Sequence, residues 1–462
     1  MTASGETSGR AASASRGQLP VVLRNPAFGA VWAAQVLTQA AARMFQVGVV
    51  WWLVSQAAGA DRGFASGAFL AVSTLPAVVL VPLVARIVAR CPHRGVLAGA
   101  AAVAGLVATA TATWTYTAQP PTGMIYGAAL LLAGCQALFD PCLTTSVPEL
   151  VEDADIEAAT GFELATQSLA GLAGGLLGPL LVDAWDLAGI VAGCAGAYLA
   201  AAALVALTRF PRTAAAPAAH APGDVPKRRT LRQILSELPF IRQVLLCFAA
   251  ANVFTTAVFV VMPLYTRSVL HGQGSTVAAL EAALGVGTLL GSFTGGRLSG
   301  SPTAVGGTCL ALMALALGMP GAAPGLAVAL VSLALAGWCV GVIGVRFVAL
   351  FQRSVPAADK PGFFAVMQAL LGATFPLSSL VFGVLGDHLG ARWLCLVQGV
   401  GLAPVAVALF LLGRRGRAAT EGPNAAPQDE RTAAPGAPAP ASPRDTATED
   451  VRAIPASLEG AR

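Results

Sequence analysis

Two acidic residues stand in apolar stretches of the sequence, where a charge is costly. Asp140 lies in the run GCQALFDPCLTT, and Glu163 lies in the next apolar stretch along the chain. A charge at the centre of a membrane-spanning helix costs roughly 2.5–3.5 kcal/mol on insertion scales, so each acid requires a partner, a water-filled cavity or a function. If both stretches cross a membrane, each acid lies about 9 Å below the same surface.

Two acids at one depth can share a proton, which would make the pair a proton carrier. The alternative is a gate on the inner side, in which Asp140, together with Glu163, pairs with a cation when the gate closes. Arg346 and Arg90 are the candidate cations, and Pro141 would loosen the helix end. We favour the gate, because Asp140 lies nearer to the inner surface than to the middle of the membrane.

A second group of polar residues forms one stripe on a single predicted helix. Gln35, Thr38, Gln39 and Gln46 are spaced three, four and seven apart, and Arg43 lies about 40° from Gln39 on the same side. Such a stripe is typical of a helix that lines a substrate cavity, although Arg43 could instead bind backbone carbonyls of a neighbouring helix. An arginine in this place favours an anionic or a polar neutral compound.

Other polar residues lie in the second half of the chain. Glu281 is a candidate for proton coupling, with solvation in an outer vestibule as the alternative. Asn252 and Gln368 are candidates to line the cavity, with hydrogen bonding between helices as the alternative. Trp51 and Trp52, near the outer end of the first predicted helix, fit an interfacial aromatic belt.

Composition indicates which elements position these residues. The chain has 462 residues, of which 56% are hydrophobic and only 11% are charged, about half the charge of an ordinary soluble protein. Its apolar runs are long enough to cross a hydrocarbon core about 30 Å thick. We predict an all-α membrane protein with twelve transmembrane helices near 27–56, 64–89, 95–117, 124–146, 157–181, 187–208, 243–266, 275–297, 303–320, 325–350, 363–386 and 392–412.

The positions of lysine and arginine test this number of crossings. If the amino terminus lies inside, 24 of the 28 cations fall on the cytoplasmic side, as the positive-inside rule requires. We therefore expect a multi-pass protein of the plasma (inner) membrane with both termini in the cytoplasm.

The two halves of the predicted bundle resemble each other. TTSVPEL ends the fourth helix and QRSVPAA ends the tenth, 208 residues later, which indicates two parallel six-helix repeats, an architecture known among transporters. The predicted parts are a cytoplasmic tail at 1–26, six-helix bundles at 27–208 and 243–412, a cytoplasmic linker at 209–242 and a disordered cytoplasmic tail at 413–462.

Glycines at helical spacing predict close approaches between helices. One set lies in the fifth predicted helix and another lies in the eighth, which we expect at the contact between the halves. We favour simple packing over a specific role in coupling. These residues are Gly171, Gly174, Gly178, Pro179, Gly287, Gly291 and Gly295.

Over roughly residues 24–412 the sequence resembles the major facilitator superfamily, and within it the branch of the enterobactin exporter and the macrolide efflux proteins. The resemblance implies the major facilitator fold and an export function. It departs from the family pattern at Ala89 before Arg90, and at Ala42 before Arg43, where acids are usual. The stretches that carry it are NPAFGAVWAAQVLTQAAARMFQVGVVWWLVSQ, ALFDPCLTTSVPELV, GLLGPLL, VMPLYTRSVL and FQRSVPAADKPGFFAVMQAL.

No Walker loop, nucleophile motif or clustered metal ligands occur in the sequence, so we expect neither an enzyme nor a metal or other cofactor. The expected function is secondary active export of a small amphipathic compound by alternating access, with protons as the coupling ion. The alternatives are an uptake carrier for a metabolite or lipid, and a transport-inactive receptor or scaffold. The expected partners are the substrate and the lipid bilayer, not nucleic acid, with the protein as a monomer.

Overall fold

The computed structural model describes residues 21–56, 61–118, 120–151, 155–210, 239–356 and 360–420. These residues form α-helices joined by short turns, without a strand. Most of the predicted amino-terminal tail, most of the linker and the end of the carboxy-terminal tail lie outside the described residues.

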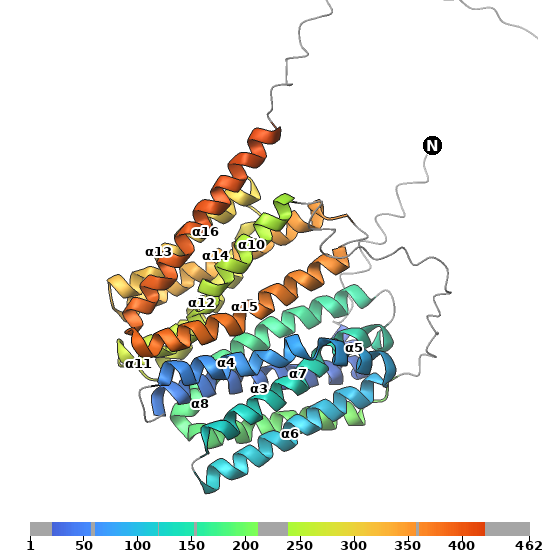
Figure 1. The fold of residues 1–462 in the computed structure, drawn as a ribbon. Coiled ribbons are helices and arrows are strands. Elements are labelled where there is room, and N and C mark those ends of the chain that lie inside the picture. Colours follow the sequence, from blue (N-terminus) through green and yellow to red (C-terminus); the bar gives the residue numbers. More distant parts are fainter. Residues whose placement is uncertain are drawn as a thin grey trace, which may run out of the picture. The chain divides into compact units, whose positions relative to one another are not determined.

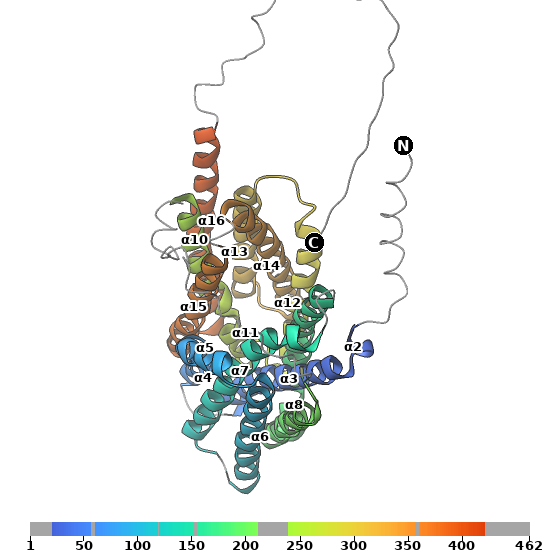
Figure 2. The same ribbon diagram turned by 90° about the vertical axis from the view of Figure 1, so that its right-hand side faces the viewer.

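The first half of the chain forms helices α2 to α8, drawn from blue to green in Figures 1 and 2. Their bounds are α2 Val21–Arg24, α3 Pro26–Gln56, α4 Arg62–Val79, α5 Val81–Arg90, α6 His93–Thr117, α7 Thr122–Leu150 and α8 Ile156–Leu207. The second predicted span is divided into α4 and α5 at Leu80, between Pro76 and Pro82, because a proline ring clashes with the preceding turn and removes a backbone donor.

Helix α8 contains two of the predicted spans. The chain turns between them at Asp186, which has φ 55° and ψ −174°. The side chain of Asp186 accepts a hydrogen bond from the backbone N–H of Leu187, at 2.7 Å, so the residue caps the helical segment that follows it.

The second half forms helices α10 to α16, drawn from yellow-green to red. Their bounds are α10 Pro239–Thr256, α11 Val258–Ser268, α12 Gly274–Gly295, α13 Pro302–Ala322, α14 Leu326–Ser354, α15 Lys360–His388 and α16 Ala391–Thr420. The seventh predicted span is divided into α10 and α11 at Ala257. The hydroxyls of Thr255 and Thr256 both donate to the carbonyl of Asn252, a pattern that weakens and bends a helix.

Ten helical segments of the described chain are long and apolar enough to cross a membrane. One of them, Leu169–Leu207, contains the turn at Asp186 and therefore supplies two spans. Helix α3 has the length of a span, but its polar stripe lowers its hydropathy, so it is not among the ten. With α3 included, the described residues form twelve membrane-spanning segments in two sets of six, which confirms the predicted all-α membrane fold.

The glycine stripes pack neighbouring helices within each half rather than the halves against each other. A Cβ on Gly174 or Gly178 would meet the backbone of α3. Likewise, a Cβ on Gly287 or Gly291 would overlap the backbone of α14. The glycines Gly174, Gly178, Gly287 and Gly291 therefore pack within their own halves. The halves meet through α8 and α12, as expected, and Pro179 takes part in that contact, because its carbonyl lies against Gly274 of α12.

The contact between α12 and α14 is reciprocal, because Gly337 and Gly341 of α14 face the backbone of α12. We expect Gly291→Ala to destabilise the protein, because the new methyl overlaps the carbonyl of Trp338, and overpacking typically costs about 1–3 kcal/mol. The control is Gly171→Ala, since a Cβ at Gly171 meets no atom within 4 Å. Thermal unfolding in detergent measures the effect; equal melting temperatures for the two variants would contradict the prediction.

Candidate functional site

A polar pocket of about 340 Å³ lies within the first half, between α3, α4, α7 and α8. Helix α3 contributes three of the predicted stripe residues, Gln39, Arg43 and Gln46. Hydrophobic side chains form other parts of the wall, including Phe45 and Leu132. The further polar residues of the wall are Ser73, Thr74, Gln136, Asp140, Gln167 and Tyr198.

Asp140 is the acidic residue of this pocket, and two amides orient its carboxylate. Its Oδ1 accepts hydrogen bonds from Gln39 Nε2 at 3.1 Å and from Gln136 Nε2 at 2.7 Å. No cation of the described chain lies within ion-pair distance of Asp140. Helix α7 continues through Pro141 to Leu150, so this proline does not end the helix.

Glu163 lies beside the pocket, in contact with the same helix as Asp140. The hydroxyl of Thr144, one turn after Asp140, donates to Glu163 Oε1 at 2.6 Å. Glu163 is buried, and its Oε2 has no hydrogen-bond partner among the described residues. Thr144 therefore links α7 to this second acid, and the sharing of a proton between the two acids stays a prediction.

Arg43 and Glu281, two residues that the sequence offered no reason to pair, meet across the seam between the halves. Arg43 NH2 lies 3.6 Å from Glu281 Oε2, and its other terminal nitrogen donates to Gln46 Oε1 at 2.8 Å. The guanidinium also lies 5.0 Å from the centre of the Phe259 ring, within the range of a cation–π contact. The Glu281 side chain is only 10% exposed. An ion pair inside the membrane thus joins α3 to α12.

Two further carboxylates join the halves at one end of the seam. Asp183 of α8 accepts from the backbone N–H of Gly274, at the start of α12, at 2.5 Å. Asp387 of α15 accepts from the N–H groups of Gly63 and Phe64, at the start of α4, at 2.7 and 2.8 Å. Each acid therefore occupies the N-terminus of a helix of the other half, where unpaired N–H groups and the helix dipole favour negative charge. We call this end of the bundle the latch end.

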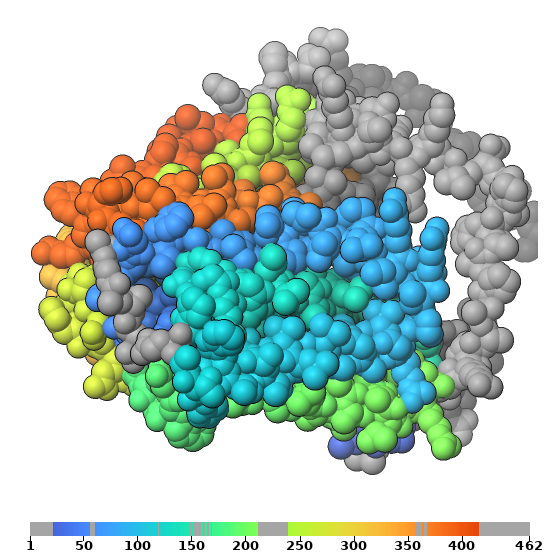
Figure 3. All heavy atoms as spheres, turned by 60° about the horizontal axis from the view of Figure 1, so that its bottom comes forward, coloured from blue at the N-terminus to red at the C-terminus, as the bar shows by residue number. Residues whose placement is uncertain are grey.

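The backbones of α4 and α15 come into direct contact beside Asp387. A Cβ added to Gly67 would overlap the carbonyl of Ser379, and a Cβ added to Gly383 would lie 2.7 Å from the carbonyl oxygen of Gly63. Figure 3 shows the two helices side by side, α4 in blue and α15 in orange. Only glycine fits at these positions.

Trp51 belongs to the latch end rather than to an interfacial belt. Its Nε1 donates to the second oxygen of Asp183 at 2.8 Å, and the side chain is 2% exposed. The expectation of an interfacial role is therefore wrong for Trp51, because its indole N–H has a buried acceptor.

The structure places the remaining predicted residues outside the polar pocket. Gln35 is buried against the backbone of Glu163, and Asn252 joins α10 to α15 through Leu371 O and Thr374 Oγ1. Gln368 is exposed on α15. These positions in the second half line no part of this cavity.

The two candidate gate cations do not contact Asp140 in this conformation. Arg346 donates to the carbonyls of Leu298 and Gly300, which follow α12, and Arg90 is exposed at the end of α5. Their pairing with Asp140 in a second, closed conformation stays a prediction.

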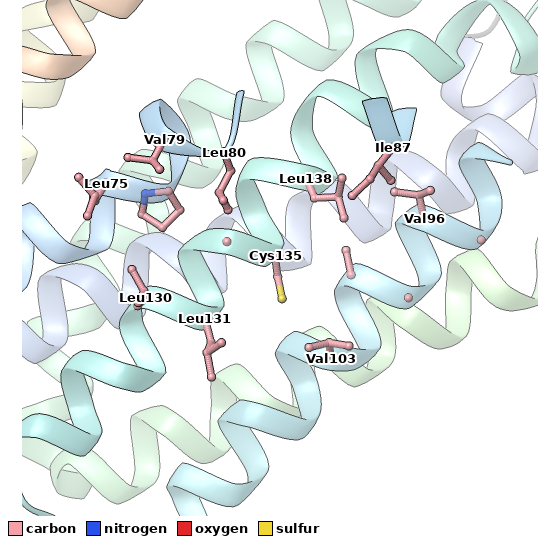
Figure 4. Close-up of a pocket in the computed structure, with 15 residues that line it drawn as sticks. Leu75, Val79, Leu80, Ile87, Val96, Val103, Leu130, Leu131, Cys135 and Leu138 are labelled. Atoms are coloured by element: carbon pink, nitrogen blue, oxygen red, sulfur yellow. The ribbon is translucent and has the colours of Figure 1, made fainter. Parts of the chain in front are cut away.

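An apolar groove of about 620 Å³, which no sequence pattern indicated, lies among exposed side chains of the first half. It lies at the kink between α4 and α5 and is bounded by α6 and α7 (Figure 4). Leu75, Leu131 and Val103 are among its exposed wall residues. Since no lining side chain carries an oxygen or nitrogen, the groove cannot orient a polar compound, and the polar pocket remains the candidate site.

Comparison with known proteins identifies the fold. A family model described as Major Facilitator Superfamily matches residues 31–323, whereas no curated protein matches the sequence. A bacterial homologue of the human lysosomal transporter Spinster, solved in an inward-facing and occupied conformation, has a TM-score of 0.67 at 12% identity, covering 86% of this chain and 98% of that one. An autoinhibited POT family peptide transporter has a TM-score of 0.65 at 13% identity, with coverage of 84% and 97%. The nucleoside transporter NupG, as a D323A mutant, has a TM-score of 0.62 at 11% identity, with coverage of 84% and 99%.

Proposed function

Because the chain belongs to the Major Facilitator Superfamily, we propose that it is a proton-coupled exporter of a small amphipathic compound, such as a drug, an antibiotic or a siderophore. It works by alternating access between its two six-helix halves, in a plasma (inner) membrane with both termini in the cytoplasm. The observation that supports coupling most directly is the buried ion pair between Arg43 and Glu281, since each half contributes one charge.

The coupling follows from the cost of an unpaired charge inside the membrane. When the halves rock apart at the level of this pair, Arg43 and Glu281 must separate, and a separated buried charge is costly. A proton that binds Glu281 neutralises it and removes the cost of that separated charge. Arg43 keeps its hydrogen bond to Gln46, which lies on the same helix. Separation of the halves would therefore be linked to proton binding.

The direction of transport is part of the proposal. The latch end is closed in this structure by Asp183 and Asp387. If the termini lie in the cytoplasm, the latch end lies outside, because the start of α4 follows a single crossing by α3. This conformation then loads its substrate from the cytoplasm. Export then requires the latch to open while the opposite end closes.

Accumulation assays in an efflux-deficient host test this function. Cells that produce the protein should accumulate less of at least one compound from a panel of drugs and siderophores, and a protonophore should abolish the difference. Higher accumulation would instead indicate an uptake carrier. No change across the panel, with the protein present in the membrane, would favour a receptor or scaffold.

A further inference from the structure

We propose that Asp140 and its side of the polar pocket form a subsite for an organic cation, namely the protonated or quaternary amine of the transported compound. This inference rests on the proposed transport function and specifies the substrate class. It differs from the anionic or neutral cargo that Arg43 favours when the sequence is considered alone.

The charges of the pocket leave one negative charge uncompensated. Its charged lining residues are Arg43 and Asp140. Arg43 is paired with Glu281 at 3.6 Å and lies against Phe259, so its charge is largely offset. Asp140 has no such partner in the described chain, and its two contacts with amides are neutral. A carboxylate that is partly withdrawn from water favours a counter-ion.

One oxygen of Asp140 is left for a ligand. Both amides bind Oδ1, whereas Oδ2 accepts no hydrogen bond from the described residues. Oδ2 is not among the buried atoms that lack a partner, so it retains exposed surface. The amides of Gln39 and Gln136 hold the carboxylate in a fixed orientation, which is what a specific ionic contact requires.

Tyr198 is an independent indication that the pocket takes a ligand. Tyr198 lines the same pocket, is 2% exposed, and has a hydroxyl without a hydrogen-bond partner among the described residues. Buried hydroxyls normally have a hydrogen-bond partner. A polar group of a bound compound would provide the partner that the Tyr198 hydroxyl lacks. Phe45 and Leu132 provide apolar wall for the hydrocarbon part of the compound. A volume of about 340 Å³ lies at the low end of the range for small-molecule sites, about 300–1,000 Å³.

Binding to the purified full-length protein, without any proton gradient, tests the subsite. The probe is radiolabelled benzyltrimethylammonium, measured by equilibrium dialysis in nanodiscs. The competitors are neopentylbenzene, which has a carbon in place of the charged nitrogen, and the anion phenylmethanesulfonate. We expect neither competitor to displace the probe.

Asp140→Asn should weaken binding of the cation by about tenfold or more, because it removes the charge and keeps the shape of the side chain. Asp140→Glu, which keeps the charge, should retain binding within a few-fold and serves as the control for folding. Glu149→Gln is the matched control, since Glu149 lies on the same helix but pairs with His93 outside the pocket. It should bind like the parent protein.

Three results would overturn the subsite: no binding of the cation by the parent, unchanged binding by Asp140→Asn, or equal competition by the neutral compound. Failure of the transport function has a different signature. Charge-dependent binding that Asp140→Asn removes, in a protein that moves no compound in cells, would support the subsite and refute the exporter.

Discussion

Glu281→Gln should reduce proton-driven export to background, a loss of about tenfold or more, since it removes the proton acceptor and leaves Arg43 without its ionic partner. The effect follows from the position of the pair, with one charge on each half and a separation of 3.6 Å. Arg43→Gln should have a similar effect on export, because an unpaired Glu281 is then left inside the membrane. Uptake into inverted membrane vesicles energised by an imposed pH gradient measures the loss.

The double variant distinguishes coupling from simple destabilisation. Removing one member of a buried pair costs about 3–5 kcal/mol, whereas replacing both by apolar residues of similar volume is often close to neutral. Arg43→Met combined with Glu281→Leu should therefore recover the melting temperature of the parent but not its response to the pH gradient. Recovery of gradient-driven export in the double variant would show that the pair has only a structural role.

Asp387→Asn combined with Asp183→Asn should shift the protein towards a conformation that is open at the latch end. Both oxygens of each carboxylate accept hydrogen bonds, and an asparagine can accept through one oxygen only. Each hydrogen bond to a charged group contributes about 1.5–3 kcal/mol. Since about 1.4 kcal/mol corresponds to a tenfold change in an equilibrium constant, each such hydrogen bond lost between the halves should raise the open population about tenfold or more.

A buried serine at the latch end provides the measurement. Ser66 of α4 is 0% exposed in this structure, so Ser66→Cys in a cysteine-free background should react slowly with a membrane-impermeant maleimide. The two asparagine substitutions should raise that rate. Asp61→Asn is the matched control, because Asp61 lies at the same end and makes no capping hydrogen bond. Equal rates in all variants would refute the latch.

Most of the fold could be predicted from the sequence, because each membrane-spanning helix is a continuous run of apolar residues that can be recognised locally. The predictions were poorest for residues whose role depends on a contact with a distant part of the chain. Pro76 and Pro82 gave a visible reason for the break at Leu80, whereas the break at Ala257 depends on hydroxyls of Thr255 and Thr256 that also fit a continuous helix.

The site was predictable only in part, for the same reason. Of the stripe residues on α3, Gln39, Arg43 and Gln46 line one polar pocket, whereas Gln35 is buried elsewhere. The partner of Arg43 is more than two hundred residues away in the chain, so spacing alone could not identify Glu281. Asp183 and Asp387 were missed, although each is an acid near the end of a predicted span, which is a usable signal for a helix-capping role.

The contact between α4 and α15 has a consequence for leakage. Gly63, Gly67 and Gly383 bring backbone against backbone there, with no room for a side chain. A surface of this kind has no crevice that could hold a file of water molecules, so protons would find no path along it while the helices touch. Tilting the helices would separate these backbones together, since the glycines carry no side chains that could follow the movement. The contact between α4 and α15 is therefore either closed to water or fully open. Such behaviour suits a carrier that must never be open to both sides of the membrane.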